Sequence, residues 1–158
     1  MTFQVREFRQ GDEIALRAVF VSSLHAFARR DYAPDLIAAW EWATSDPVTW
    51  RDRLRINRPF IVESGDAIAG FADVQPSGFI NQFFVAGPYG GRGVASMLMT
   101  RIHECAGTRG THELSSHVSL RAEGLFLKWG FAVVERREVM LGGVLLPNAL
   151  MTNRLPVD

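Results

Sequence analysis

The stretch from Phe79 to Ala106, FINQFFVAGPYGGRGVASMLMTRIHECA, constrains the fold more than any other part of the chain. Its first part, Ile80 to Val85, is apolar enough to be a buried strand, and Gly87-Pro88 then turns the chain. A glycine-rich loop follows at 89–93. Beyond it, apolar residues recur every three or four positions and predict an amphipathic helix: Val94, Met97, Leu98, Ile102 and Cys105.

A strand that leads through a glycine-rich loop into a helix is typical of phosphate binding. The first amides of a helix have no partner within it, and the helix dipole adds about half a positive charge there, so backbone alone can hold an anion. The loop lacks the Lys-Ser/Thr ending of a triphosphate site, and GGRGVA lacks the GxGxxG spacing of a dinucleotide site. The sequence therefore disfavours both of these nucleotide sites.

Composition narrows the class of protein further. With 158 residues the chain is large enough for one domain, which we place at 1–158. Its 17 Lys and Arg balance 17 Asp and Glu, so no net charge draws it to nucleic acid or to an anionic membrane. No apolar run approaches the roughly 20 residues of a membrane helix. We expect a cytoplasmic protein without nucleic-acid or membrane partners, and its histidines show no metal-ligand spacing.

Periodicity and turn residues predict the elements on either side of the loop. A short strand near the start is followed by helices that begin near Asp12, Pro34 and Asp46, and a hairpin then precedes the fourth strand. The central helix is a crossover, so the fifth strand should run parallel to the fourth. The predicted ranges are 3–8 (strand), 59–63 and 67–74 (hairpin), 80–85 and 113–118 (fourth and fifth strands), 122–129 (helix), and 132–140 and 145–155 (terminal strands).

With Phe83-Phe84-Val85 and Pro88 before it, the loop resembles the acyl-coenzyme A signature of the GNAT superfamily of N-acetyltransferases, Q/R-x-x-G-x-G/A. Here the signature reads Gly90-Gly91-Arg92-Gly93-Val94-Ala95, with glycine in place of Gln or Arg. A second family signature, an asparagine followed by Ala-x-x-x-Tyr-x-x-x-Gly-Phe, is matched at Ala122 and Gly130-Phe131. Ser119 stands for the asparagine and Phe126 for the tyrosine. Together the two matches span most of the chain from Phe60 onward.

The resemblance implies an α/β fold: a three-layer α/β/α domain whose mixed, mostly antiparallel sheet has splayed fourth and fifth strands. Acetyl-coenzyme A would be the cosubstrate, with its pantetheine arm between those two strands. By this resemblance the main chain of Phe84 and Val85 would bond the pantetheine, and amides of Gly91 to Ala95 would hold the pyrophosphate. Gly90, Ser119 and Phe126 complete the expected cofactor site, in which Arg92 faces solvent or a 3′-phosphate.

Catalytic residues are harder to assign, because acyl transfer needs a neutral amine, a polarised carbonyl and a proton for the leaving thiolate. Phe126 cannot donate that proton, and the fourth strand offers the neutral Asn81 and Gln82 where many family members have a carboxylate. His117 is our first candidate base, since a histidine titrates near neutral pH. Asp73 is the second and Glu63 a third. A mechanism without a residue base, relying on water and orientation, stays open.

For the acceptor we expect contacts from Tyr32, Trp40 and Asn81, because the family builds part of its acceptor site from the first helical segment. The leading hypothesis is an N-acetyltransferase that moves an acetyl group directly, in a ternary complex, to a primary amine of a small molecule or peptide. Two alternatives are a non-catalytic acyl-coenzyme A-binding module and a domain with a coincidental glycine loop. Because homodimers are common in the family, we also expect a homodimer.

Overall fold

The computed structural model describes residues 2–156. The order of strands and helices along the chain is much as the periodicity predicts. The strands are β1 (Gln4–Glu7), β2 (Phe60–Ser64), β3 (Ala67–Ala72), β4 (Phe79–Ile80), β5 (Phe83–Val85), β6 (Glu113–Ser119), β7 (Ala132–Leu141) and β8 (Val144–Arg154). The helices are α1 (Glu13–Ala26), α2 (Pro34–Ala43), α3 (Pro47–Asn57), α4 (Val94–Arg109) and α5 (Glu123–Lys128).

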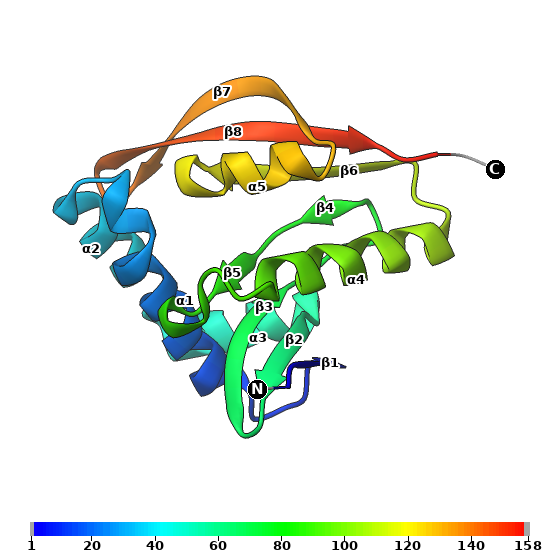
Figure 1. The fold of residues 1–158 in the computed structure, drawn as a ribbon. Coiled ribbons are helices and arrows are strands. Elements are labelled where there is room, and N and C mark those ends of the chain that lie inside the picture. The colour runs from blue at the N-terminus through cyan, green and yellow to red at the C-terminus, as the bar shows by residue number, and fades with distance from the viewer. Residues whose placement is uncertain (1, 157–158) are drawn as a thin grey trace.

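The strands form two sheets, with the order β1-β2-β3-β5 in the first and β4-β6-β8-β7 in the second. Among residues 2–156, only β4 and β6 pair in parallel, and the other strand pairings are antiparallel. Figure 1 shows β4 and β5 as consecutive short strands, with β4 lying toward β6 and β5 lying toward β3. The predicted fourth strand, 80–85, corresponds to β4 and β5, and the predicted fifth strand, 113–118, corresponds to β6. The splay expected between these two predicted strands is therefore confirmed.

Helices cover both faces of these sheets because neighbouring strand residues point to opposite sides. Ile61 and Phe71 pack with the buried faces of α1, α2 and α3. Val62 and Ala72 pack instead with the buried residues of α4 and with Phe126 of α5. The expected three-layer arrangement is confirmed. No helix within residues 2–156 is long and apolar enough to cross a membrane.

Two polar residues that directly precede a helix do not cap it. Asp12 and Ser119 stand at these positions, but neither side chain bonds a helix amide. Asp46 caps α3 as its sequence position suggests, accepting a bond from the Thr49 amide at 3.2 Å. Asp12 does not cap α1 because its carboxylate is bound by a residue of strand β1.

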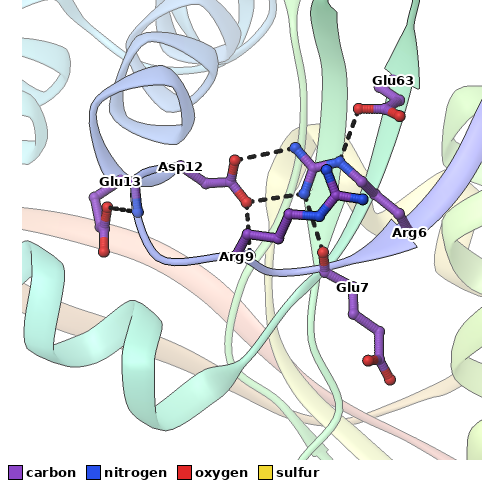
Figure 2. A network of polar contacts seen from close by, with 7 residues as sticks. Arg6, Glu7, Arg9, Asp12, Glu13 and Glu63 are labelled. Carbon is purple, nitrogen blue, oxygen red and sulfur yellow. Dashed lines mark hydrogen bonds and ion pairs between the residues drawn. The ribbon is translucent and has the colours of Figure 1, made fainter.

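That residue is Arg6, which ties β1, β2 and the start of α1 together (Figure 2). Its guanidinium bonds both oxygens of Asp12, at 2.9 and 3.0 Å, and Glu63 Oε2 at 2.7 Å. The Arg9 amide donates a further bond of 2.7 Å to Asp12. Burial would raise the pKa of Asp12, but the bonds from Arg6 and Arg9 outweigh it and hold that pKa below the ordinary 3.8.

Replacing Arg6 by Met should lower the free energy of unfolding by about 2–3 kcal/mol at neutral pH, since two carboxylates lose a charged hydrogen-bond donor. A carboxyl group with a depressed pKa stabilises the fold only while it is ionised. The loss should therefore shrink as the pH falls below 3.8, the ordinary pKa of Asp12. Urea denaturation at neutral and acid pH measures both effects, with Arg51→Met as the control because its ion pair is long and exposed.

Candidate active site

The fourth strand of the expected fold is broken at Asn81 and Gln82. Before the break, Phe79 and Ile80 pair with Ser115 and Ser116 of β6. After it, the residues of β5 pair with β3 on the opposite side. The chain thus crosses from one sheet to the other, so β5 does not pair with the end of β6.

Asp73 holds this break in place. Its carboxylate accepts bonds from the amides of Asn81 and Gln82, both at 2.9 Å, and from Gln75 Nε2 at 3.0 Å. The side chain is fully buried, and this burial outweighs the three bonds and raises the pKa of Asp73 to about 6. Asp73 does not line the cleft described below. Its position favours a role in shaping the strand over proton transfer.

A cleft of about 150 Å³ opens where the two strands separate. It contains most of the side chains expected around a reacting centre: His117, Trp40, Asn81, Phe84, Ser119 and Phe126. The rest of the lining comes from the helices and from the strands on either side of the gap: Phe20, Thr44, Arg53, Gln82, Phe83, Ser116, Val118, Ala122, Leu146 and Asn148. Tyr32, Val85 and the loop at 90–95 lie outside this lining.

Backbone groups on both strands point into the gap. The Gln82 carbonyl and the Ala86 amide bond β3, so by alternation the main chain of Phe84 faces β3, while that of Phe83 and Val85 faces the gap. On β6, the Ser115 amide bonds Gly78 on the β4 side, so Ser119 also directs its main chain to that side. The main-chain groups that face the gap therefore belong to Phe83, Val85 and Ser119, whereas the main chain of Phe84, predicted to bond the pantetheine, faces β3 instead.

Tyr32 closes the other side of β6. Its hydroxyl accepts a bond from the Leu120 amide at 2.9 Å and donates one to the Pro147 carbonyl at 2.8 Å. The hydroxyl thus bridges the Leu120 amide and the Pro147 carbonyl just beyond the last paired residues of β6 and β8, Ser119 and Asn148. Pro147 itself has no amide hydrogen to donate to β6. Tyr32 is 5% exposed, and burial raises its pKa. This geometry favours a structural role over acceptor contact.

His117 is the one imidazole in the cleft lining. Its ring lies 5.2 Å from that of Phe79, edge to face. Partial burial, and then the charge of Arg137, lower its pKa below the ordinary 6.5. The imidazole is therefore neutral at neutral pH, which is the protonation state that a base requires.

The glycine loop presents its backbone as an anion site would. Gly91 and Gly93 have φ values of +73° and +85°, which residues with a Cβ rarely adopt. The first bond of α4 runs from the Met97 amide to the Gly93 carbonyl, so the amides of Val94, Ala95 and Ser96 have no acceptor within the helix. A Cβ built at Gly91 or Gly93 would meet no atom within 4 Å, so the loop leaves room for a ligand. Arg92 is exposed, with its guanidinium 5.9 Å from the Tyr89 ring centroid.

Gly90 departs from the family signature for a steric reason. A Cβ at this position would lie 2.7 Å from Cζ of Phe27 and 2.9 Å from its Cε1. The ring of Phe27, which follows α1, therefore occupies the space that a Gln or Arg side chain would need.

The second signature also shows what replaces its usual residues. Phe126 is 2% exposed and packs its ring between Phe83, at 5.5 Å, and Phe131, at 4.9 Å. Ser119 lines the cleft at the end of β6. Both residues thus lie where a bound pantetheine is expected, but Phe126 has no proton to give.

Several lining residues were not among the predicted site residues, and the polar ones include Thr44, Arg53, Ser116 and Asn148. Ser116 donates a bond of 2.8 Å to the Ile80 carbonyl and so ties β6 to β4 just before the gap. Asn148 pairs with Ser119 across the sheet. Because the fifth strand and the terminal strands were predicted, this pairing is the signal by which Asn148 could have been placed beside the site. Within residues 2–156 no group of three or more His, Cys, Asp or Glu is placed to hold a metal ion.

Comparisons with known proteins agree with this geometry. The family model described as an acetyltransferase (GNAT) domain matches residues 28–150, and the chain therefore belongs to the GNAT acetyltransferase family. It is 28% identical to YafP of Escherichia coli, described as an uncharacterized N-acetyltransferase, over 94% of this chain and 93% of that protein. A GCN5-related N-acetyltransferase from Rhodopseudomonas palustris is also 28% identical, with a TM-score of 0.93 over 98% of this chain and 97% of that one.

A more distant structure shows the same fold with a ligand. The PaiA N-acetyltransferase of Thermoplasma acidophilum, solved in complex with coenzyme A, is 14% identical and has a TM-score of 0.76, covering 98% of this chain and all of that one (100%). At this identity the likeness concerns the fold alone.

Restoring the family residue at position 90 should destabilise this protein. We expect Gly90→Gln to lower the free energy of unfolding by about 1–3 kcal/mol, because the new side chain overpacks against Phe27. Gly107→Gln is the matched control, since a Cβ there meets nothing within 4 Å. The combination with Phe27→Ala should cost less than the sum of the single changes. A Gly90→Gln variant as stable as the parent would contradict the steric account.

Proposed function

We propose that this protein is an acetyl-coenzyme A-dependent N-acetyltransferase that transfers the acetyl group directly, in a ternary complex, to a primary amine of a small molecule or peptide. The observation that carries the proposal is the joint presence of the strand gap and the open glycine loop at the start of α4. The gap offers main-chain groups to an extended arm, and the loop offers amides to a phosphate.

The bound cosubstrate would supply an activated thioester, and the protein's own groups do the remaining work. Amides of Phe83 and Val85 face the gap and are the donors that we assign to the thioester carbonyl. His117, held neutral by its surroundings, takes the proton of the attacking amine. Because a thiol of pKa about 8–9 is a good leaving group, the thiolate departs without help from Phe126.

We assign the two ends of the cleft to different substrates. Ser119, Ala122 and Phe126, on β6 and at α5, form the end assigned to the pantetheine. Trp40, Thr44 and Arg53, on and next to α2 and α3, form the end assigned to the acceptor. The ring of Trp40 is fixed at that end by edge-to-face contacts with Phe20, at 6.1 Å, and Phe84, at 6.4 Å.

Acetyl-coenzyme A should raise the melting temperature. A ligand at a hundred times its Kd stabilises by about 2.7 kcal/mol. For a domain of this size we expect the midpoint to rise by about 5–10 °C. Coenzyme A should act similarly, and ATP at the same concentration should have little effect. No rise with saturating acetyl-coenzyme A would overturn the assignment of the loop and the gap.

If His117 is the base, kcat/KM should fall as the pH falls through the pKa of its imidazole, which lies below 6.5. His117→Ala should lower kcat by about a hundredfold or more, the usual contribution of a general base, and should remove this acid limb from the profile. His112→Ala is the control, because this exposed histidine lies outside the cleft. An unchanged acid limb in His117→Ala would assign the ionisation to another group.

Phe126 stands where the family signature has a tyrosine, and this substitution favours a second candidate function, a domain that binds acyl-coenzyme A without turnover. Both candidates predict the thermal shift, so turnover must separate them. We expect release of free thiol, followed with a thiol reagent, when acetyl-coenzyme A and a broad panel of amines are supplied together. Ligand binding without thiol release for any amine would favour the binding module.

A further inference from the structure

The charges in the lining of the cleft are one-sided. Among residues 2–156 its lining contains no carboxylate, and Arg53 is the only residue in it that is always charged. Amines are cations at neutral pH until they lose a proton, and sites built for polyamines need carboxylates to balance the additional charges. The acceptor end of this cleft offers none.

Arg53 lies on α3 and lines the cleft together with Asn81 and Thr44. Its neighbours on the helix are engaged elsewhere: Arg51 pairs with Asp52, and Arg55 pairs with Glu13. Within the described part of the chain, the guanidinium of Arg53 has neither a hydrogen bond nor an ion pair. Its planar group of donors matches the two oxygens of a carboxylate.

Asn148 supplies a second, independent observation. The residue is 8% exposed and lines the cleft, and its Oδ1 is a buried acceptor without a hydrogen-bond donor among residues 2–156. A buried polar atom left unpaired costs stability, so such atoms in a cleft mark the place of a ligand group. A carbonyl oxygen of this kind accepts a hydrogen bond from an amine.

Arg137 adds positive charge beside Asn148. The two residues are direct partners on β7 and β8, so their side chains stand on the same face of the sheet. Nη1 of Arg137 is buried and has no acceptor within the described residues. The charge of Arg137 also reaches His117, whose pKa it lowers by more than the nearby Glu135 raises it. The cleft therefore has one arginine in its lining, Arg53 on α3, and a second, Arg137, beside the lining residue Asn148.

We propose that the acceptor is a small amine that also carries a carboxylate, such as an amino acid, with its carboxylate on Arg53 and its amine on Asn148 Oδ1. This inference rests on the proposed acetyl transfer and names the substrate class of the same site. Polyamines and other multiply charged cations are excluded from the site by the same charges, since they would meet Arg53 without a compensating carboxylate.

The test compares amino acids with their own carboxamides as acceptors. Each pair has the same side chain and amine position and differs in the carboxylate. We expect kcat/KM to favour the acid by about tenfold or more, as for a charged hydrogen-bonded pair. The preference for the acid should hold although the amine group of the carboxamide loses its proton more readily than that of the amino acid. Arg53→Met should reduce the preference to about one, mainly through KM, and Arg53→Lys should retain part of it.

Arg51→Met is the matched control, because it removes the same charge from the same helix outside the cleft. It should leave the preference for acids unchanged. Asn148→Asp should lower the preference by placing a negative charge near the carboxylate. Turnover of polyamines or amides in preference to acids would overturn this inference and leave the acetyltransferase proposal standing. Binding of acetyl-coenzyme A with no thiol release for any amine would overturn both.

Discussion

The bonds from Asp73 to the amides of Asn81 and Gln82 are the constraint on which the site depends. An unbroken strand from Phe79 to Val85 would pair along its whole length with β6 and leave no gap. Instead, the carboxylate takes two amides out of the ladder and turns the chain from one sheet to the other. Full burial of a carboxyl group is costly, and here the three donors around it offset part of that cost.

The same break gives the cleft two chemically different ends. Toward β6 and α5 it is lined by backbone and apolar groups, which suit an extended thioester arm. Toward α2 and α3 it presents Trp40, Thr44 and Arg53, which combine an aromatic wall, a hydroxyl and a cation. Asn148, a buried acceptor, lies on β8 directly opposite Ser119. The lining also includes the neutral imidazole of His117. Binding of the thioester arm and selection of the amine are thus assigned to different elements, so the acceptor end can change without loss of the coenzyme site.

Most of the fold could be predicted from the sequence because hydrophobic periodicity and turn residues act locally. The central helix, the hairpin and the two terminal strands all follow from such patterns. The break at Asn81 could not, since Asn and Gln within an apolar run are compatible with a strand and Asp73 acts from eight residues away in sequence. The contact between Gly90 and Phe27 likewise depends on how α1 docks against the loop.

The candidate site was predictable where family signatures fix the backbone, and less so where the tertiary structure selects side chains. His117, Trp40 and Phe126 were predicted and line the cleft. Tyr32 and Asp73 were predicted for chemistry, but their hydrogen bonds support roles in shaping the strands. Arg53 is one of several arginines on α3, and no sequence pattern distinguishes the one that faces the cleft.

Residue-resolved amide hydrogen exchange, measured with and without acetyl-coenzyme A, tests the central claim most directly. The account predicts that the amides of Val85 and Ser119, which face the gap, exchange quickly alone and are protected at saturating ligand. The amides of Phe84 and Val118, which bond neighbouring strands, should exchange slowly in both states. Slow exchange at Val85 and Ser119 without ligand, or no protection with it, would contradict the claim that the broken strand builds the coenzyme site.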